Sequence, residues 1–138
     1  MNRRSLLIIA AVAILGFGGY YYFNQPADPD GGGAPLVNVS IPSLTQSQQV
    51  GAVAYAENCA ACHGINAAGQ EGVAPPLVHK IYEPSHHGDR AFFMAALNGV
   101  RAHHWPFGNM PPVEGVTQQD VASIVEYVRA LQRANGIN

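Results

Sequence analysis

Charged side chains are scarce in this sequence of 138 residues, and neither sign dominates. Lys, Arg, Asp and Glu make up 12% of the chain, about half the usual share of a soluble domain. Seven basic residues against nine acidic ones give a formal net charge of -2. That charge excludes the positive surface on which nucleic-acid binding depends. The length leaves no room for a two-domain enzyme, so we expect one domain with a single small site.

Cysteines are equally few, and no segment shows the alternation of a β-strand. The two cysteines, Cys59 and Cys62, are so close that a bridge between them would remove little chain entropy, which argues against a disulfide scaffold. Long loops rich in Gly and Pro separate the helical segments described below. Such loops need an organising element other than a backbone ladder.

One long apolar run stands at the N-terminus. Residues 6–23 carry no charge, and as a helix these 18 residues would span about 27 Å, close to the thickness of a bilayer core. Arg3 and Arg4 precede the run and no basic residue follows before Lys80, which predicts export of everything after Phe23. We expect residues 1–23 to be an uncleaved membrane anchor. The alternative is a signal peptide cleaved near Gly16–Gly18, which would export the same residues.

The remaining chain divides into a linker and a domain. Residues 24–44 contain seven Gly or Pro, two acidic residues and no basic one, which predicts a solvated linker. It would either let the domain sample several neighbours or serve as a simple spacer. Residues 45–138 hold every cysteine and histidine in the chain and form the predicted working domain.

Three helices are predicted in this domain. Thr45 and Gln48 form a capping box for a helix ending near Ala60, with Val50, Val53 and Ala54 on its inner face. A second, short helix spans residues 90–98 between Asp89 and Gly99. Thr117 caps a third, in which apolar residues recur at offsets of 3, 4, 7 and 10: Val121, Ile124, Val125, Val128 and Leu131. The pattern predicts an all-α domain with long loops.

Cys59, Cys62 and His63 match C-x-x-C-H, the attachment signature of c-type haem. Thiols one helical turn apart can each bond one vinyl group of a porphyrin, while the adjacent imidazole reaches the iron from the same face. A thioredoxin-like pair would need a βαβ pattern around it, and a zinc site would need a second pair of cysteines. Both are missing, so we interpret the motif as a haem c site.

A haem that transfers electrons needs a sixth iron ligand, and Met110 is the candidate. It precedes Pro111 and Pro112, which stiffen the backbone and so help to hold a weak thioether ligand in place. Met94 is the rival, but it falls within the short helix among apolar residues, where core packing is its expected role. Ligation by His63 and Met110 raises the reduction potential relative to two histidines.

Together these residues resemble the class I c-type cytochromes of bacterial periplasms and membranes. The resemblance covers roughly residues 45–134. It implies the class I cytochrome c fold around one covalently bound haem, with the first and last helices crossing at Gly51 and Tyr127. It also implies that the Pro75 carbonyl accepts a hydrogen bond from the axial histidine.

Arg101 and Trp105 precede the methionine loop, where members of this family often place donors to a haem propionate. An indole and a guanidinium would offset the cost of burying that carboxylate. In the alternative, Trp105 simply covers the haem edge and Arg101 is solvated.

Five further histidines are more than such a domain needs: His79, His86, His87, His103 and His104. The two adjacent pairs could bind copper or zinc, but no spacing forces them to share a centre. Hydrogen bonding at the surface or beside the haem is the favoured interpretation. The pairs could also make the potential or docking depend on pH, because histidine titrates near neutrality.

The resemblance implies a monohaem electron carrier rather than an enzyme, anchored in the bacterial inner membrane with its haem domain in the periplasm. Its expected partners are redox proteins: a dehydrogenase, a reductase, an oxidase or a bc1-type complex. Residues 45–138 hold five basic residues against seven acidic ones, which predicts mainly apolar docking with weak salt dependence. The alternatives are a fixed haem subunit of an oxidoreductase complex, a ligand-binding or peroxidatic haem protein, and a histidine-rich metal-handling protein.

Overall fold

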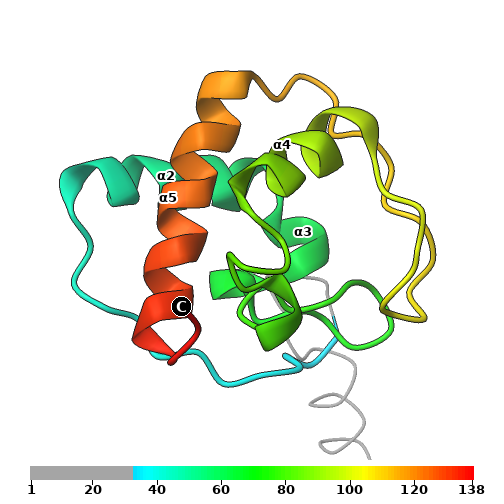
Figure 1. The fold of residues 1–138 in the computed structure, drawn as a ribbon, viewed down its shortest axis with the longest axis horizontal. Helices are drawn as coiled ribbons and strands as arrows, with labels where there is room; N and C mark the ends of the chain where they lie inside the picture. Colours follow the sequence, from blue (N-terminus) through cyan, green and yellow to red (C-terminus); the bar gives the residue numbers. More distant parts are fainter. Residues whose placement is uncertain (1–32) are drawn as a thin grey trace, which may run out of the picture.

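The computed structural model describes residues 33–138, and the elements in this part of the chain are helices joined by loops (Figure 1). No strand occurs among these residues, which contain two isolated β-bridges, so the expected all-α domain is confirmed. The helices follow in the order α2 (Gln46–Asn58), α3 (Ala60–His63), η1 (Ile65–Ala67), η2 (Lys80–Tyr82), α4 (Asp89–Asn98) and α5 (Gln118–Ala134).

The expected membrane anchor, residues 1–23, lies outside the described residues. Within residues 33–138, every helix is too short or too polar to cross a bilayer.

Helices α2 and α5 cross to form the core of the domain (Figure 1). A Cβ at Gly51 would overlap the Ser123 carbonyl oxygen and lie 3.0 Å from the Tyr127 Cβ, so only glycine allows this approach. The Tyr55 and Tyr127 rings lie 5.5 Å apart beside the crossing. The expected contact between Gly51 and Tyr127 is therefore present.

The two helices differ in how well their apolar pattern predicted their buried face. All five apolar residues named for α5 are buried, as predicted. In α2 the prediction was wrong for Val50 and Val53, which are 58% and 59% exposed. Ala54 is buried as predicted, and Gly51 and Tyr55 complete the buried face of α2. This face is the one whose backbone approaches α5 closely at Gly51.

Both helices begin with the predicted caps. The Thr45 hydroxyl accepts from the Gln48 amide, and the Gln48 side chain accepts from the Thr45 amide. Thr117 and Asp120 form the same reciprocal arrangement at the start of α5. Each box satisfies backbone donors that a helix N-terminus leaves without partners.

Residues 34–40, in the second half of the expected linker, run along the surface of the domain. The amides of Leu36 and Val37 donate to the Ala68 carbonyl, and the Glu71 amide donates to the Ala34 carbonyl. Ser40 and the Asn135 side chain exchange two hydrogen bonds of 2.9 Å near the end of α5. Most of these residues are exposed, in keeping with a solvated segment. Their attachment to the domain was not expected, because Gly and Pro content does not reveal backbone hydrogen bonds.

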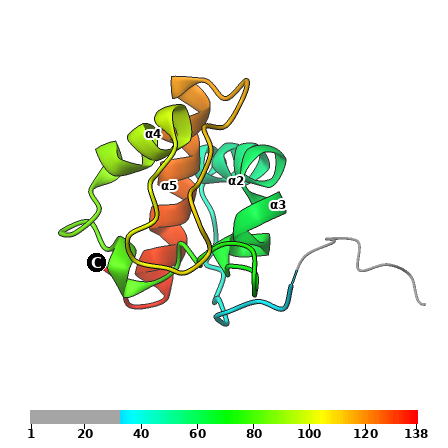
Figure 2. The ribbon, with the colours of Figure 1, turned by 90° about the vertical axis from the view of Figure 1, so that its right-hand side faces the viewer.

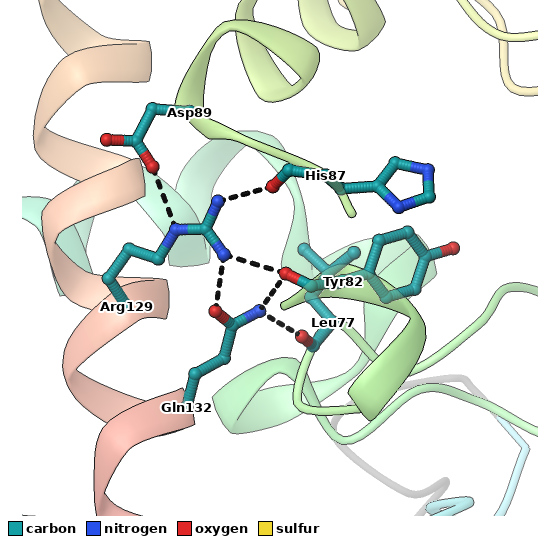
Figure 3. A network of polar contacts seen from close by, with 6 residues as sticks. All are labelled: Leu77, Tyr82, His87, Asp89, Arg129 and Gln132. Atoms are coloured by element: carbon teal, nitrogen blue, oxygen red, sulfur yellow. Dashed lines mark hydrogen bonds and ion pairs between the residues drawn. The ribbon is translucent and has the colours of Figure 1, made fainter. Parts of the chain in front are cut away.

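A buried polar network joins α5 to the loops before α4 (Figure 3). The Arg129 guanidinium donates to Asp89 at 2.8 Å and to the carbonyls of Tyr82 and His87 at 2.7 and 2.5 Å. Gln132 accepts from Arg129 and donates to the carbonyls of Leu77 and Tyr82. The network thus fixes the backbone of a long loop that has no ladder of its own.

Candidate functional site

A cavity of about 480 Å³ opens between α3 and α4, with a mostly apolar lining. Cys59, Cys62 and His63 line one side, and α4 with the loop over residues 99–113 lines the other. Figure 2 shows this loop, in yellow, descending from α4 and returning toward α5. None of the residues of α4 is fully buried. Most of its apolar residues line this cavity, and Phe92 also packs against the core.

The C-x-x-C-H segment is held in one helical turn by its own backbone and by a neighbouring loop. The His63 amide donates to the Cys59 carbonyl at 2.9 Å, and the Gly69 amide donates to the His63 carbonyl at 2.8 Å. The side chain of the buried Gln70 donates through Nε2 to the carbonyls of Ala60 and Ala61. These bonds keep the three motif side chains on the cavity wall.

His63 has a fixed orientation. Its Nδ1 lies 2.8 Å from the Pro75 carbonyl oxygen, the contact that the resemblance implied. A carbonyl can only accept, so Nδ1 carries the proton and Nε2 keeps a free lone pair. Burial lowers the pKa of His63, against the opposing effect of the Pro75 hydrogen bond. The side chain is thus a neutral imidazole suited to bind a metal.

The Cys59 thiol does not have the lowered pKa of a reactive redox cysteine. Burial, with a smaller effect from Cys62, raises the pKa of Cys59 to about 11. Reactive cysteines of the thioredoxin type have lowered pKa values, because the thiolate is the nucleophile. This finding agrees with the absence of a βαβ pattern around the motif.

Met110 lies on the cavity wall in a tightly held loop. It exchanges backbone hydrogen bonds of 2.9 and 3.0 Å with Val100. Gly99, at a φ of 75°, lies so close that a Cβ there would overlap the Met110 carbonyl oxygen.

Met94 also lines the cavity and is 49% exposed, so the expectation that it packs in the core was wrong. Its sulfur accepts a long hydrogen bond of 3.8 Å from the Asn98 side chain.

The two expected propionate donors are placed differently. Trp105 lines the cavity, and its buried indole N–H has no hydrogen-bond partner among residues 33–138. The Trp105 indole lies near the Tyr82 hydroxyl and offsets part of the rise that burial causes in the pKa of Tyr82. The two groups nevertheless lie outside hydrogen-bond geometry. Arg101 is exposed and is not part of the cavity wall. A buried donor without a partner fits a cofactor that brings an acceptor.

Four of the five extra histidines gather at the rim of this cavity. The rings of His86, His87, His103 and His104 lie within 4.2 to 6.1 Å of one another in five pairs. Slight desolvation and the neighbouring rings, His103 foremost, lower the pKa of His104. His79 lies apart from the four and packs edge-on against Trp105.

Sequence reasoning did not find the residues that support the site from behind. Gln70, Arg129 and Gln132 are buried polar residues. Arg129 is one of the five basic residues counted in residues 45–138, a count that does not distinguish buried from exposed bases. Its position in the apolar repeat of α5, immediately after Val128, was the one available signal of burial.

The cytochrome c family model matches residues 48–132, which is more than half of the chain. The chain belongs to the cytochrome c family. Two relatives are named cbb3-type cytochrome c oxidase subunit CcoP. The protein from Rubrivivax gelatinosus is 33% identical over 91 residues, covering 64% of this chain and 27% of the relative. The protein from Cereibacter sphaeroides is 37% identical over 83 residues, covering 59% and 26%. This cytochrome c chain thus spans about a quarter of the length of each relative.

Membership confirms the class I c-type resemblance, and haem c, covalently attached, is the cofactor of this cytochrome. The residues present fit that group. The cavity is lined mainly by apolar atoms, its motif wall offers two thiols and a neutral imidazole, and its rim carries the unpartnered indole N–H.

Proposed function

We propose that this cytochrome c domain carries single electrons between redox proteins of a respiratory chain, using one haem c. The observation that supports this most is the placement of His63 and Met110 around one apolar cavity, with His63 oriented by Pro75. When bound, the haem supplies the one-electron chemistry of its iron. The protein then contributes attachment, axial ligands and exclusion of water.

In this proposal Cys59 and Cys62 form the thioether bonds, and His63 and Met110 are the axial ligands. The Pro75 carbonyl keeps the proton of His63 on Nδ1, which leaves Nε2 for the iron. Trp105 donates to a propionate. Arg101 has no role in the proposed site, because its side chain is exposed outside the cavity wall.

The membrane arrangement is also part of the proposal. Residues 1–23 would anchor the protein in the bacterial inner membrane and leave the haem domain in the periplasm. Docking would be mainly apolar, through exposed side chains beside the cavity such as Val73, Met94 and Leu97. Electron transfer to the partner should change little between low and physiological ionic strength. Strong slowing by salt would contradict this mode of docking.

A second candidate is a fixed haem subunit of an oxidase or related membrane complex. The names of the two relatives favour it, although this chain corresponds to about a quarter of each. Extraction in mild detergent separates the two candidates. Stoichiometric co-purification with oxidase subunits would favour the fixed subunit, whereas release of the haem protein alone would favour the carrier.

The axial ligand is tested by comparing Met110→Ala with Met94→Leu in the haem-loaded protein. We expect Met110→Ala to abolish the thioether-to-iron absorption band and to lower the reduction potential, because a weak acceptor ligand is lost. Met94→Leu should preserve both, since it keeps the apolar volume of the wall. The reverse result would assign the ligand to Met94.

A reduced parent protein that binds carbon monoxide readily at neutral pH would instead have an open iron position. That result would favour the ligand-binding or peroxidatic alternative over the electron carrier.

A further inference from the structure

The histidines at the cavity rim come from two loops that are distant in sequence. His86 and His87 lie in the turn before α4, whereas His104 lies in the loop after it. One ligand nitrogen from each of the three can be chosen so that all lie within 4.8 Å of one another. Neither the haem motif nor its axial ligands require this convergence.

The spacing of two of these nitrogens suits a tetrahedral metal ion. His86 Nε2 and His104 Nε2 are 3.4 Å apart, which also allows a hydrogen bond between the rings when one of these nitrogens carries a proton. Two imidazole nitrogens, each roughly 2.05 Å from one tetrahedral zinc ion, lie about 3.3 Å apart. Square-planar or octahedral neighbours at the same bond length would lie only about 2.9 Å apart, so the observed distance favours the tetrahedral ion.

His87 is oriented as a metal ligand. Its Nδ1 donates to the Ile81 carbonyl at 2.6 Å, so Nε2 keeps the lone pair. Metal-bound histidines almost always have such a bond on the other ring nitrogen. The Arg129 guanidinium also donates to the His87 carbonyl, which fixes the backbone from the opposite side. Figure 3 shows the His87 ring pointing away from this buried network.

The turn that carries the first two ligands is itself well defined. The amides of His86 and His87 both donate to the Glu83 carbonyl, at 3.0 and 2.8 Å. This turn brings the two adjacent rings to within 4.6 Å, although neighbouring side chains commonly point apart. His86 and His104 are exposed, so their rings can rotate to close the remaining distance to a common ion.

We propose that His86, His87 and His104 bind one zinc ion through their Nε2 atoms, with water in the fourth position. The ion links the turn before α4 to the loop that leads to Met110. It is separate from the haem iron and lies at the rim of the same cavity, where His87 and His104 are wall residues. His103 stacks on His87 but stays outside the ligand set, because its nitrogens do not belong to the group of three.

Zinc chloride titrated into the haem-loaded protein, followed by calorimetry, tests the site directly. We expect one zinc ion per chain. His86→Ala and His104→Ala should each weaken binding at least about tenfold, since a three-histidine site loses a ligand. His103→Ala is the matched control, an exposed histidine in the same loop, and should stay within about threefold of the parent.

Hydrogen exchange distinguishes a bridging ion from zinc held by one histidine. Zinc should slow exchange in both loops, over residues 83–88 and 101–105, in the parent and in His103→Ala. It should have no such effect in His104→Ala, whose absorption spectrum shows whether the haem site is intact. The proposal would be overturned if His104→Ala bound zinc as tightly as the parent. It would also be overturned if His104→Ala and His103→Ala lost zinc affinity equally. Protection of one loop alone would overturn the bridge.

Discussion

The crossing of α2 with α5 and the wall formed by α4 with residues 99–113 differ in what their apolar side chains contact. At the α2–α5 crossing, the side chains of the two helices pack against each other, and the α5 backbone approaches Gly51 directly. On the wall, α4 has no fully buried residue, and most of its apolar residues line the cavity. The first region is stabilised by contacts within the protein. The second has an apolar surface that the haem covers when it is bound.

This comparison predicts two levels of stability in the haem-loaded protein. Amides of α5 around Val128 should exchange only by global unfolding, because they lie in the packed core. Amides of α4 should exchange through partial openings that cost at least about 3 kcal/mol less. Native-state hydrogen exchange in low denaturant measures both. Equal opening free energies for α4 and α5 would contradict the division.

Gly51→Val breaks the packed region at its closest contact. The added side chain would overlap the Ser123 carbonyl, so we expect a loss of about 3 kcal/mol in the free energy of unfolding. Val53→Ala, at a position that is 59% exposed on the same helix, should change it by less than about 0.5 kcal/mol. Urea unfolding measures both variants. Similar losses would show that the crossing does not depend on this glycine.

Arg129→Met removes the guanidinium that connects α5 to the loop before α4, and it keeps an apolar side chain of similar length. We expect a loss of about 2 kcal/mol, because the His87 carbonyl and Gln132 lose a charged donor in a buried setting. Asp89→Ala should cost under about 1 kcal/mol, since that carboxylate is 65% exposed. Urea unfolding again measures the difference. A larger loss in Asp89→Ala would mean that the ion pair, and not the carbonyl contacts, stabilises the loop.

Thr117→Ala gives the smallest effect and tests the start of α5. Loss of the cap should lower the free energy of unfolding by about 1 kcal/mol at neutral pH. Hydrogen bonds from Thr117 lower the pKa of Asp120, so this pair stabilises the fold above the usual aspartate pKa. The contribution is lost as the pH falls through the lowered value. Unfolding curves at neutral and strongly acidic pH should therefore show a smaller mutant difference in acid.

Sequence predicted those features that depend on neighbouring residues. The capping box at Thr45, the cap at Thr117 and the C-x-x-C-H turn each involve a few consecutive positions. The stripe of α5 was predictable because that helix buries nearly a whole face, whereas α2 contacts it through Gly51 and leaves Val50 and Val53 in solvent.

Features that join distant segments were not predictable in the same way. His86 and His104 meet only because two loops fold toward each other, and no helical spacing relates them. Arg129 is 7% exposed and pairs with Asp89 across 40 positions, which a count of basic residues does not reveal. The attachment of residues 34–40 to the domain was not predicted, because it uses backbone groups, which composition does not report.

The path of those residues has a mechanical consequence. The chain enters the domain beside Glu71 and Ala68, in the loop whose Gly69 amide binds the His63 carbonyl. A force applied through the N-terminal side therefore acts first on the segment that positions the proposed axial histidine. The force reaches α5 only later along the chain, through the hydrogen bonds between Ser40 and Asn135. A pull on the chain would strain the surroundings of the iron before it strained the core.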